Sequence, residues 1–242
     1  RNKRSLTLNM AVPAGQKILA GLVEKADVLI DNFRIGTLEK WGFTDAWFEQ
    51  HAPHLIRCSI TGYGSSGPKA ALPGYDFILQ AESGLMSICG EPDAGPTKYG
   101  VAIVDVCTGM LACNSILAAL NARHRTGKGQ KVELSLYETS LAMLINVASN
   151  YLISGDEAER YGNGHPNIVP YQAFQTSDGY VVVACGNDRL YQSLCHMLER
   201  DDLAADPRFA TNPQRVVNRA ELVPLLQEAF RQRASEDWLT QL

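Results

Sequence analysis

The sequence predicts an α/β protein in which helices cover a parallel β-sheet. Amphipathic helical segments alternate with short apolar segments over roughly the first 150 residues, which is the pattern of repeated β-α-β units. The chain is also long enough for a large core: it has 242 residues, of which 45% are hydrophobic and 20% charged, an ordinary globular composition. We therefore expect a Rossmann-like large domain with a parallel sheet, followed by a second, smaller α+β domain.

The predicted elements of the large domain follow from local patterns. Pro13 near the start, with apolar residues at 18, 19, 22 and 23, predicts an amphipathic helix over 13–26. Gly42 ends a short helix that begins at Thr37. The remaining expectations are an extended segment at 5–10, strands at 27–32, 55–60 and 131–136, a loop at 61–74, and helices at 75–88, from about 108 onward, and at 137–153.

The second domain is predicted from a change in composition near residues 155–170. This polar segment with glycines and prolines is typical of a crossover between domains. After it, 171–187 has the pattern of a β-hairpin turning at Ser177-Asp178-Gly179, and helical patterns follow at 190–199 and 219–233. We expect the domains to divide into residues 1–160 and 161–242.

Charge and cysteine usage exclude several classes of protein. The net charge of −4 does not favour a nucleic-acid partner or an anionic membrane surface. No run of 18 apolar residues is present, so we expect no membrane span. The six cysteines are scattered without a C-x-x-C pair, which indicates reduced core thiols rather than disulfides or a zinc site. The expected compartment is the cytoplasm, or the mitochondrial matrix in a eukaryote.

Asp105 is the candidate reactive residue. It stands alone in the apolar run GVAIVDVCTGMLACNSILAAL, just before a long helix. Burying an unpartnered carboxylate is costly, so the position calls for an explanation. One explanation is a helix cap, because an acid at a helix start meets free backbone N–H groups. The other is an ionised nucleophile held in an apolar pocket. Composition alone leaves both open.

Seven ordered phrases support the second explanation. They are NKRSLTLNM, DNFRIGTLEKWG, SITGYGSSGP, PGYDFILQAESGLM, IVDVCTGM, RHRTGKGQKVELSLYE and FQTSDGYVVVACGN. Together they resemble the class III (CaiB/BaiF-type) coenzyme A transferases over nearly the whole chain. The match is to the middle of the family pattern, so we expect the chain to be a fragment that lacks both family termini.

The resemblance implies a reaction and a site. In that family an aspartate attacks an acyl thioester, and Asp105 stands where this nucleophile is expected. The carboxylate would form a mixed anhydride and then an aspartyl-CoA thioester, which a second acid attacks. No metal or redox cofactor is implied, because CoA is itself substrate and product. The positions that match family contacts to CoA are Leu8, Asn9, Met10, Asn32, Phe33, Arg34, Lys40, Pro73, Gly74, Tyr75 and Asp76.

Some of these positions have simpler interpretations. Arg34 and Lys40 suit phosphate groups, but either could belong to a solvated basic face. The segment at 73–76 could be only a turn and a helix cap. Gly162, Asn163, Gly164 and His165 match a loop that closes over the intermediates in relatives, and the same residues could be only a flexible crossover.

The resemblance also sets the alternatives. An α-methylacyl-CoA racemase shares the fold, but racemases carry a histidine where this chain has Tyr75, a poor acid/base group at its ordinary pKa. A truncated, non-catalytic homologue is the other alternative. The 165–187 region is most similar to the branch that uses dicarboxylates such as succinate and glutarate or hydroxymethylglutarate. Family members are interlocked homodimers, so we expect a homodimer that binds an acyl-CoA and a carboxylic acid.

Overall fold

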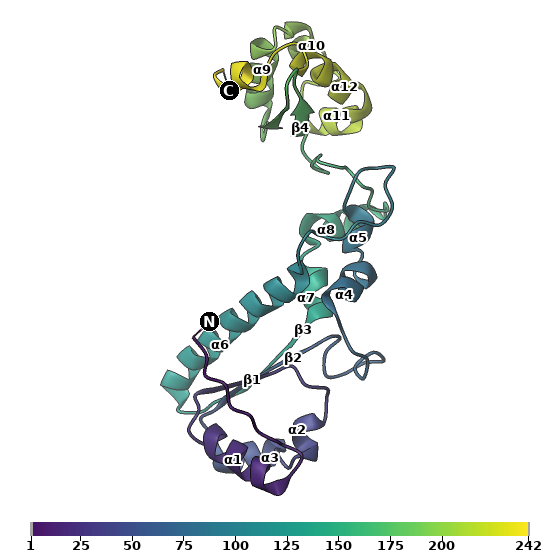
Figure 1. Cartoon of the computed structure of the whole chain (residues 1–242). Coiled ribbons are helices and arrows are strands. Elements are labelled where there is room, and N and C mark those ends of the chain that lie inside the picture. Colours follow the sequence, from purple (N-terminus) through teal and green to yellow (C-terminus); the bar gives the residue numbers. More distant parts are fainter. Residues whose placement is uncertain (1, 242) are drawn as a thin grey trace. The chain divides into compact units, whose positions relative to one another are not determined.

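The chain forms two compact units. The computed structural model describes residues 2–241, and Figure 1 shows the course of the chain. The first unit comprises the residues up to Ser87 together with Lys98–Asp156, and the second comprises Ile88–Thr97 and the residues from Glu157 onward. The division at Asp156 lies close to the boundary expected at 160. Ile88–Thr97, expected in the large domain, groups with the second unit, where Arg160 Nη1 donates to the Ala94 carbonyl at 2.9 Å.

The first unit is built on a three-stranded parallel sheet of order β1-β2-β3. Val28 pairs with Ile56, and Arg57 pairs with Lys131, so all three strands run in one direction. The elements of this unit are α1 (Pro13–Val23), β1 (Val28–Asp31), α2 (Thr37–Lys40), α3 (Asp45–His51), β2 (Ile56–Thr61), α4 (Asp76–Glu82), α5 (Leu85–Ile88, whose last residue groups with the second unit), α6 (Ile103–Thr126), β3 (Lys131–Ser135), α7 (Leu136–Ala142) and α8 (Ile145–Ser154). The α/β prediction is confirmed.

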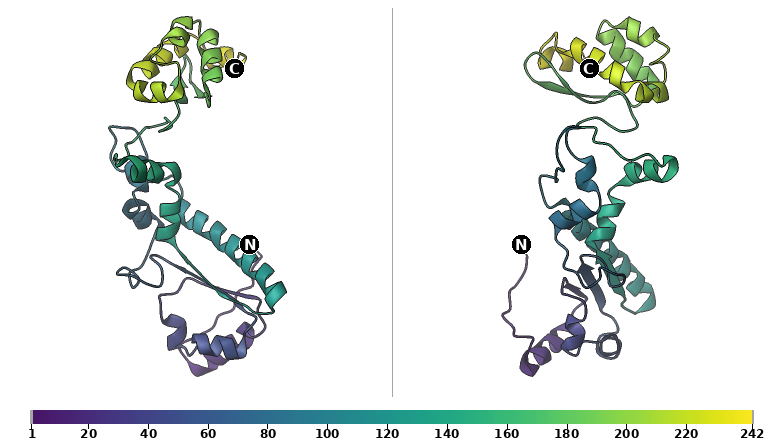
Figure 2. Two further views of the ribbon diagram at one scale, coloured as in Figure 1. Left: turned by 180° about the vertical axis from the view of Figure 1, so that it is seen from behind. Right: turned by 90° about the vertical axis from the view of Figure 1, so that its right-hand side faces the viewer.

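Helix α6 covers one side of this sheet, and α1–α3 lie on the other (Figures 1 and 2). Its buried residues Val104, Thr108, Ala112 and Ala119 recur at helical spacing and form the stripe that packs inward. At its other end, Arg123 donates to the Asp27 carboxylate at 2.8 Å and to the His54 carbonyl at 3.1 Å. Because Asp27 and His54 precede β1 and β2, these bonds fix α6 along the sheet.

Helix α6 is also apolar enough in composition, and long enough, to cross a bilayer, although no such run was expected from the sequence. Only 22% of its most apolar window is buried within this chain. Helices in the cores of α/β domains can have the same length and composition, and a protein partner can cover such a helix as well as a bilayer can. The exposed apolar side chains on α6 include Val106, Met110, Leu111 and Leu117.

Several expected helices are shorter than their patterns. The helix expected at 75–88 is divided into α4 and α5 by Gly84, whose φ of +89° is left-handed. The helix expected at 137–153 is divided into α7 and α8 at Ile145, which has a φ of +43°. Helix α3 was not expected; Thr44 begins it by accepting a hydrogen bond from the Trp47 N–H. Residues 2–9 form no regular strand.

The cysteines are free throughout the described chain. Cys58, Cys185 and Cys195 are buried, as expected of core thiols, and burial raises the pKa of the Cys185 thiol to about 11. Cys113, in contrast, is exposed on α6. It lies one residue beyond the buried Ala112, off the inward-facing stripe.

The second unit is an antiparallel hairpin packed with helices. Tyr171 pairs with Ala184 and Gln175 with Tyr180, so the hairpin expected around Ser177-Asp178-Gly179 is confirmed. Its elements are β4 (Tyr171–Gln175), β5 (Tyr180–Ala184), α9 (Asp188–Met197), α10 (Asp201–Ala205), α11 (Asn212–Val217), α12 (Arg219–Phe230) and α13 (Ser235–Leu239). The core contains Phe174, Phe230 and Trp238, with Phe174 stacked on Phe230 at 4.8 Å between ring centroids.

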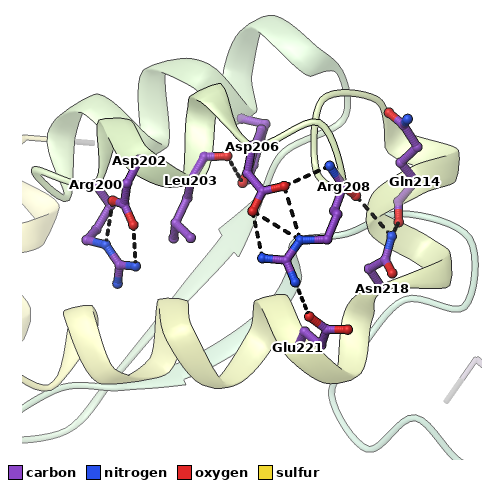
Figure 3. Close-up of polar contacts among 9 residues, drawn as sticks. Arg200, Asp202, Leu203, Asp206, Arg208, Gln214, Asn218 and Glu221 are labelled. Atoms are coloured by element: carbon purple, nitrogen blue, oxygen red, sulfur yellow. Dashed lines mark hydrogen bonds and ion pairs between the residues drawn. The ribbon is translucent and has the colours of Figure 1, made fainter.

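Arg215 lies at the centre of this unit and is fully buried. Its guanidinium donates to the Val169 carbonyl at 2.7 Å, to the Phe209 carbonyl at 3.0 Å and to the Asp188 carboxylate at 2.9 Å. Figure 3 shows a contrasting group on the surface, where Arg208 bonds Asp206 and Glu221. The buried Arg215 hydrogen-bonds three separate segments, whereas the side chain of Arg208 is 53% exposed.

We expect Arg215→Ala to destabilise the second unit by about 2–5 kcal/mol, because it leaves two buried carbonyl oxygens without a donor. Urea unfolding measures this loss. Arg208→Ala is the matched control, and its unfolding midpoint should stay near that of the parent because solvent replaces its ion pairs. Equal midpoints for the two variants would contradict the structural role given to Arg215.

Candidate functional site

A cavity of about 540 Å³ opens in the first unit at the carboxyl ends of the parallel strands. Asn32 follows β1, Thr61 ends β2 and Leu136 follows β3, and all three line the cavity. Open α/β sheets bind ligands at this edge, because strand ends and helix starts leave backbone groups and side chains directed outward there. The cavity is therefore the natural candidate for a binding site.

Two glycines shape the wall of this cavity. Gly62 follows β2 and Gly74 precedes α4, and their backbones touch: a Cβ on Gly62 would lie 2.5 Å from the Gly74 Cα. A Cβ on Gly74 would lie 2.3 Å from the Gly62 Cα. No larger residue fits at either position without moving the backbone, so this glycine pinch brings the start of α4 against the end of β2.

The pinch places Asp76 at the N-terminus of α6. One oxygen of its carboxylate, Oδ1, accepts hydrogen bonds from the Val104 N–H at 2.8 Å and the Asp105 N–H at 3.2 Å. The helix has no cap from its own N-cap residue, Ala102. Asp76 therefore caps α6 from another helix, and its charge lies at the positive end of the helix dipole.

Asp105 is consequently not the cap. It lies in the first turn of α6, which begins at Ile103 rather than near Thr108 as expected. Within residues 2–241 no hydrogen bond to its carboxylate is present, although it lines the cavity. The carboxylate is also not buried, contrary to our expectation: burial on α6 falls at Val104 and Thr108, and Asp105 lies on the exposed side.

The electrostatics of Asp105 are nevertheless unusual. Partial desolvation at the cavity wall, followed by the charge of Asp76, raises the pKa of the Asp105 carboxyl group above its ordinary value of 3.8. A carboxylate that neither solvent nor donors fully stabilise has more basic oxygens than an ordinary one. Asp76 and Asp105 are thus neighbouring acids in different environments. Both carboxylate oxygens of Asp76 accept hydrogen bonds, whereas the Asp105 carboxylate accepts none within residues 2–241.

The cavity gathers many of the residues expected from the sequence. Those that line it are Asn32, Phe33, Arg34, Pro73, Gly74, Tyr75, Asp76 and Asp105. Arg34 is the single cation among its lining residues, and Tyr75 is 70% exposed. Asp76 differs from the expected contact to CoA in that its carboxylate oxygens are already engaged by the protein.

Other expected residues do not line the cavity. Lys40, in the last turn of α2, is absent from its lining. Leu8, Asn9 and Met10 are also absent from the lining; a Cβ on Gly15 in α1 would lie 1.9 Å from the Asn9 carbonyl oxygen, and Gln16 Nε2 donates to the Met10 carbonyl at 3.2 Å. Their contact with CoA stays a prediction.

The expected covering loop belongs to the second unit. His165 accepts a hydrogen bond from the Asn167 N–H at its Nδ1, 3.0 Å away, and its ring packs against Tyr171. A Cβ on Gly162 would lie 2.6 Å from a carboxylate oxygen of Glu91, so this glycine is held against the segment 88–97. The role of Gly162, Asn163, Gly164 and His165 over the intermediates stays a prediction.

Several residues of the site were not expected from the sequence. Thr108 and Gly109 line the cavity together with Asp105. Gln80 donates a hydrogen bond to the Asp76 carboxylate. Helical spacing from Asp105 indicates Gly109, since residues four apart share a face. For Gln80 the sequence offers its spacing of four residues from Asp76, which places both on one face of a helix, whereas its other partner, Tyr99, is distant along the chain.

Comparison with known proteins agrees with this geometry. The model of CoA-transferase family III matches residues 1–242. The chain belongs to this family. The resemblance drawn from the seven phrases is therefore confirmed, and the α/β architecture described above is a CoA-transferase family III fold.

Individual members of CoA-transferase family III are similar over almost the whole chain. A succinyl-CoA:glutarate CoA-transferase of Mus musculus is 43% identical over 99% of the chain and 55% of its own length. A succinate–glutarate CoA-transferase of Agrobacterium fabrum is 42% identical over 99% of the chain and 60% of its own length. The crystal structure of a CaiB/BaiF family protein from Brucella suis superposes with a TM-score of 0.80 at 45% identity, covering 100% of the chain and 64% of that protein. The chain thus spans little more than half of its curated relatives.

The glycine pinch gives a stability prediction. Gly62→Ala and Gly74→Ala should each lower the free energy of unfolding by about 1–3 kcal/mol, because the new methyl group displaces backbone. Gly21→Ala on α1 is the control: nothing lies within 4 Å of its Cβ position, so the change should raise stability by up to about 1 kcal/mol. Urea unfolding in which all three variants gain stability would refute the pinch.

Proposed function

We propose that this chain supplies the reactive half of a CoA-transferase that moves CoA from an acyl-CoA to a free dicarboxylic acid. The observation that carries the proposal is the unpartnered Asp105 carboxylate on a cavity wall, at a helix N-terminus that another residue already caps. Membership of CoA-transferase family III and the names of two relatives, both acting between succinate and glutarate, support the dicarboxylate class.

Asp105 would act as the nucleophile. Its carboxylate oxygen attacks the thioester carbonyl carbon, the C–S bond breaks and CoA leaves as a thiolate, which gives a mixed anhydride. The thiolate then attacks the Asp105 carbonyl carbon and releases the donor acid as its carboxylate. The resulting Asp105 thioester accepts the second acid in the same two steps, which regenerates the Asp105 carboxylate and a new acyl-CoA.

The surroundings suit these steps. Charge is conserved between carboxylate and thiolate at each step, so no proton transfer is needed. The raised pKa of Asp105 indicates a more basic, less solvated oxygen than an ordinary carboxylate has. We expect water to be excluded from the anhydride by parts of the protein that close over the cavity.

A homodimer is part of the proposal. Large apolar side chains are exposed on two helices, Val106, Met110 and Leu117 on α6 and Tyr151, Leu152 and Ile153 on α8. Apolar surface of this extent is typical of a surface that another chain covers. Light scattering should give twice the mass of the whole protein, and a stable monomer at low concentration would refute the dimer.

Asp105→Asn in the whole protein separates nucleophile from cap. The amide cannot attack a thioester, so we expect transfer to fall below detection while the protein stays folded. Incubation of the parent protein with succinyl-CoA and then hydroxylamine should leave a hydroxamate on Asp105, found as a mass change in its peptide. An active Asn variant, or an adduct on a different residue, would overturn the assignment.

The same variant should change stability with pH. Because the folded pKa of Asp105 is raised above 3.8, ionising this group opposes folding once the pH exceeds the folded pKa, and the penalty disappears as the pH falls. Asp105→Asn should therefore be more stable than the parent at neutral pH, with the gain shrinking toward acid pH. A gain that grows as the pH falls would contradict the sign.

Arg34 and Lys40 give a paired test of CoA binding. Arg34 lines the cavity and Lys40 does not, so Arg34→Ala should weaken CoA binding about tenfold to a hundredfold, as expected for loss of a charge-assisted contact. Lys40→Ala should have a smaller effect. Isothermal titration with CoA measures both, and a larger loss for Lys40→Ala would reverse the assignment.

A further inference from the structure

Gln80 is buried next to Asp76, and both ends of its amide are hydrogen-bonded. Its side chain is 1% exposed and comes from the last turn of α4. Its Nε2 donates to Asp76 Oδ2 at 2.6 Å, and its Oε1 accepts from the Tyr99 N–H at 2.8 Å. A buried amide that satisfies two different partners has one orientation, and here both partners have fixed polarity.

The partners set that polarity without ambiguity. A backbone N–H can only donate, so the amide oxygen must face Tyr99. The amide nitrogen must then face position 76, and it needs an acceptor there, which an ionised carboxylate supplies. The four groups form one chain of hydrogen bonds, from Tyr99 through Gln80 and Asp76 to the first N–H groups of α6.

This chain leaves Asp105 with nothing to cap. The Ile103 N–H donates to the Val101 carbonyl and the Val106 N–H to the Ala102 carbonyl. Asp76 takes the two N–H groups between them. Each N–H of residues 103–106 is therefore paired without the Asp105 side chain, whose carboxylate faces the cavity unengaged.

We propose that Gln80 is a positioning residue for the transfer reaction: it holds Asp76 on the start of α6 and so keeps the Asp105 carboxylate free to attack. The inference rests on the proposed function for its kinetic consequence. The side chain of Gln80 does not line the cavity. It acts through Asp76, and it also ties Tyr99, and hence the segment leading into α6, to α4.

Removing the amide should slow the chemical step more than binding. In Gln80→Met the Asp76 carboxylate loses its restraint, and misplacement of a reacting group by about 1 Å costs on the order of a hundredfold in rate. We expect the rate of Asp105 acylation by succinyl-CoA, followed by hydroxylamine trapping in a single turnover of the whole protein, to fall about tenfold to a hundredfold. The Kd for CoA, measured by titration, should change less than about threefold, since Gln80 does not line the cavity and Arg34, the cation proposed to bind CoA, is unchanged.

A polarity swap tests the hydrogen-bond chain itself. Asp76→Asn should acylate much more slowly than the parent. The new amide nitrogen at position 76 faces Gln80 Nε2, so two donors meet. If the Gln80 amide turns over, its Nε2 faces the Tyr99 N–H instead, and two donors meet there. Adding Gln80→Glu restores every donor–acceptor pair: Asn at 76 accepts from α6 and donates to Glu at 80, which accepts from Tyr99. We expect the double variant to recover at least about tenfold of the acylation rate lost in Asp76→Asn.

Thr139→Val provides the structural control. Thr139 is buried in the same unit, 3% exposed, and its hydroxyl donates to the Ser135 carbonyl at 2.9 Å. The substitution removes a buried hydrogen bond between two residues that do not line the cavity, so it should lower stability and leave the acylation rate unchanged. A Gln80→Met variant that acylates like the parent, or a double variant no better than Asp76→Asn, would overturn the proposal.

Hydrogen exchange separates this proposal from the proposed function. In Gln80→Met the amides of Val104 and Asp105 should exchange faster than in the parent, whether or not the protein transfers CoA, while Thr139→Val leaves them protected. A parent protein that never forms an Asp105 adduct would remove the proposed function, and the faster exchange would still support Gln80 as the residue that holds this helix start. Unchanged exchange in Gln80→Met would overturn its positioning role.

Discussion

The carboxylate of Asp76 is the constraint on which the candidate site depends. It comes from α4, and its Oδ1 accepts hydrogen bonds from the Val104 and Asp105 N–H groups in the first turn of α6, while its Oδ2 accepts from Gln80. A helix start on a cavity wall offers free donors that the nearest acid would otherwise take. Since Asp76 accepts from them, the carboxylate of Asp105, in the same first turn, has no helix N–H to cap.

The two acids illustrate how environment divides roles between identical groups. Asp76 is half-buried and fully hydrogen-bonded, whereas Asp105 is exposed yet has a pKa raised by desolvation and by its neighbour's charge. Pairs of carboxylates with diverging environments are a recurrent basis for assigning separate chemical tasks. The arrangement opposes folding at neutral pH, which is the kind of local cost that reactive sites impose on a fold.

Much of the fold could be predicted from the sequence, because it rests on local patterns. The three apolar runs became the parallel strands, and the turn at Ser177-Asp178-Gly179 became the hairpin. Two expected helices were too long: nothing local marks the positive φ of Ile145, and Gly84 interrupts the helix expected at 75–88 with a left-handed φ. Asp105, the candidate nucleophile, lines the cavity, but its burial was inferred from apolar neighbours rather than from the spacing of the inward-facing stripe.

The unpredicted part of the site is non-local. Gln80 acquires its place from Tyr99, 19 residues away, and Asp76 from Val104, 28 residues away. No periodicity records such pairings. Short phrases can therefore mark a candidate aspartate by family resemblance, while its contacts with distant residues emerge only when the helices are packed.

The contact between Gly62 and Gly74 has a consequence for how such a protein can diversify. The chain between them leaves the sheet and returns to nearly the same point, so its length is decoupled from the framework on either side. Lengthening a closed surface loop adds only a slowly growing entropy cost. Ala70, Ala71 and Leu72 of this loop border the cavity, so insertions or exchanges there can reshape what the cavity accepts without disturbing the helix that carries Asp105. The contact between Gly62 and Gly74 therefore allows the loop between them to change in length and sequence.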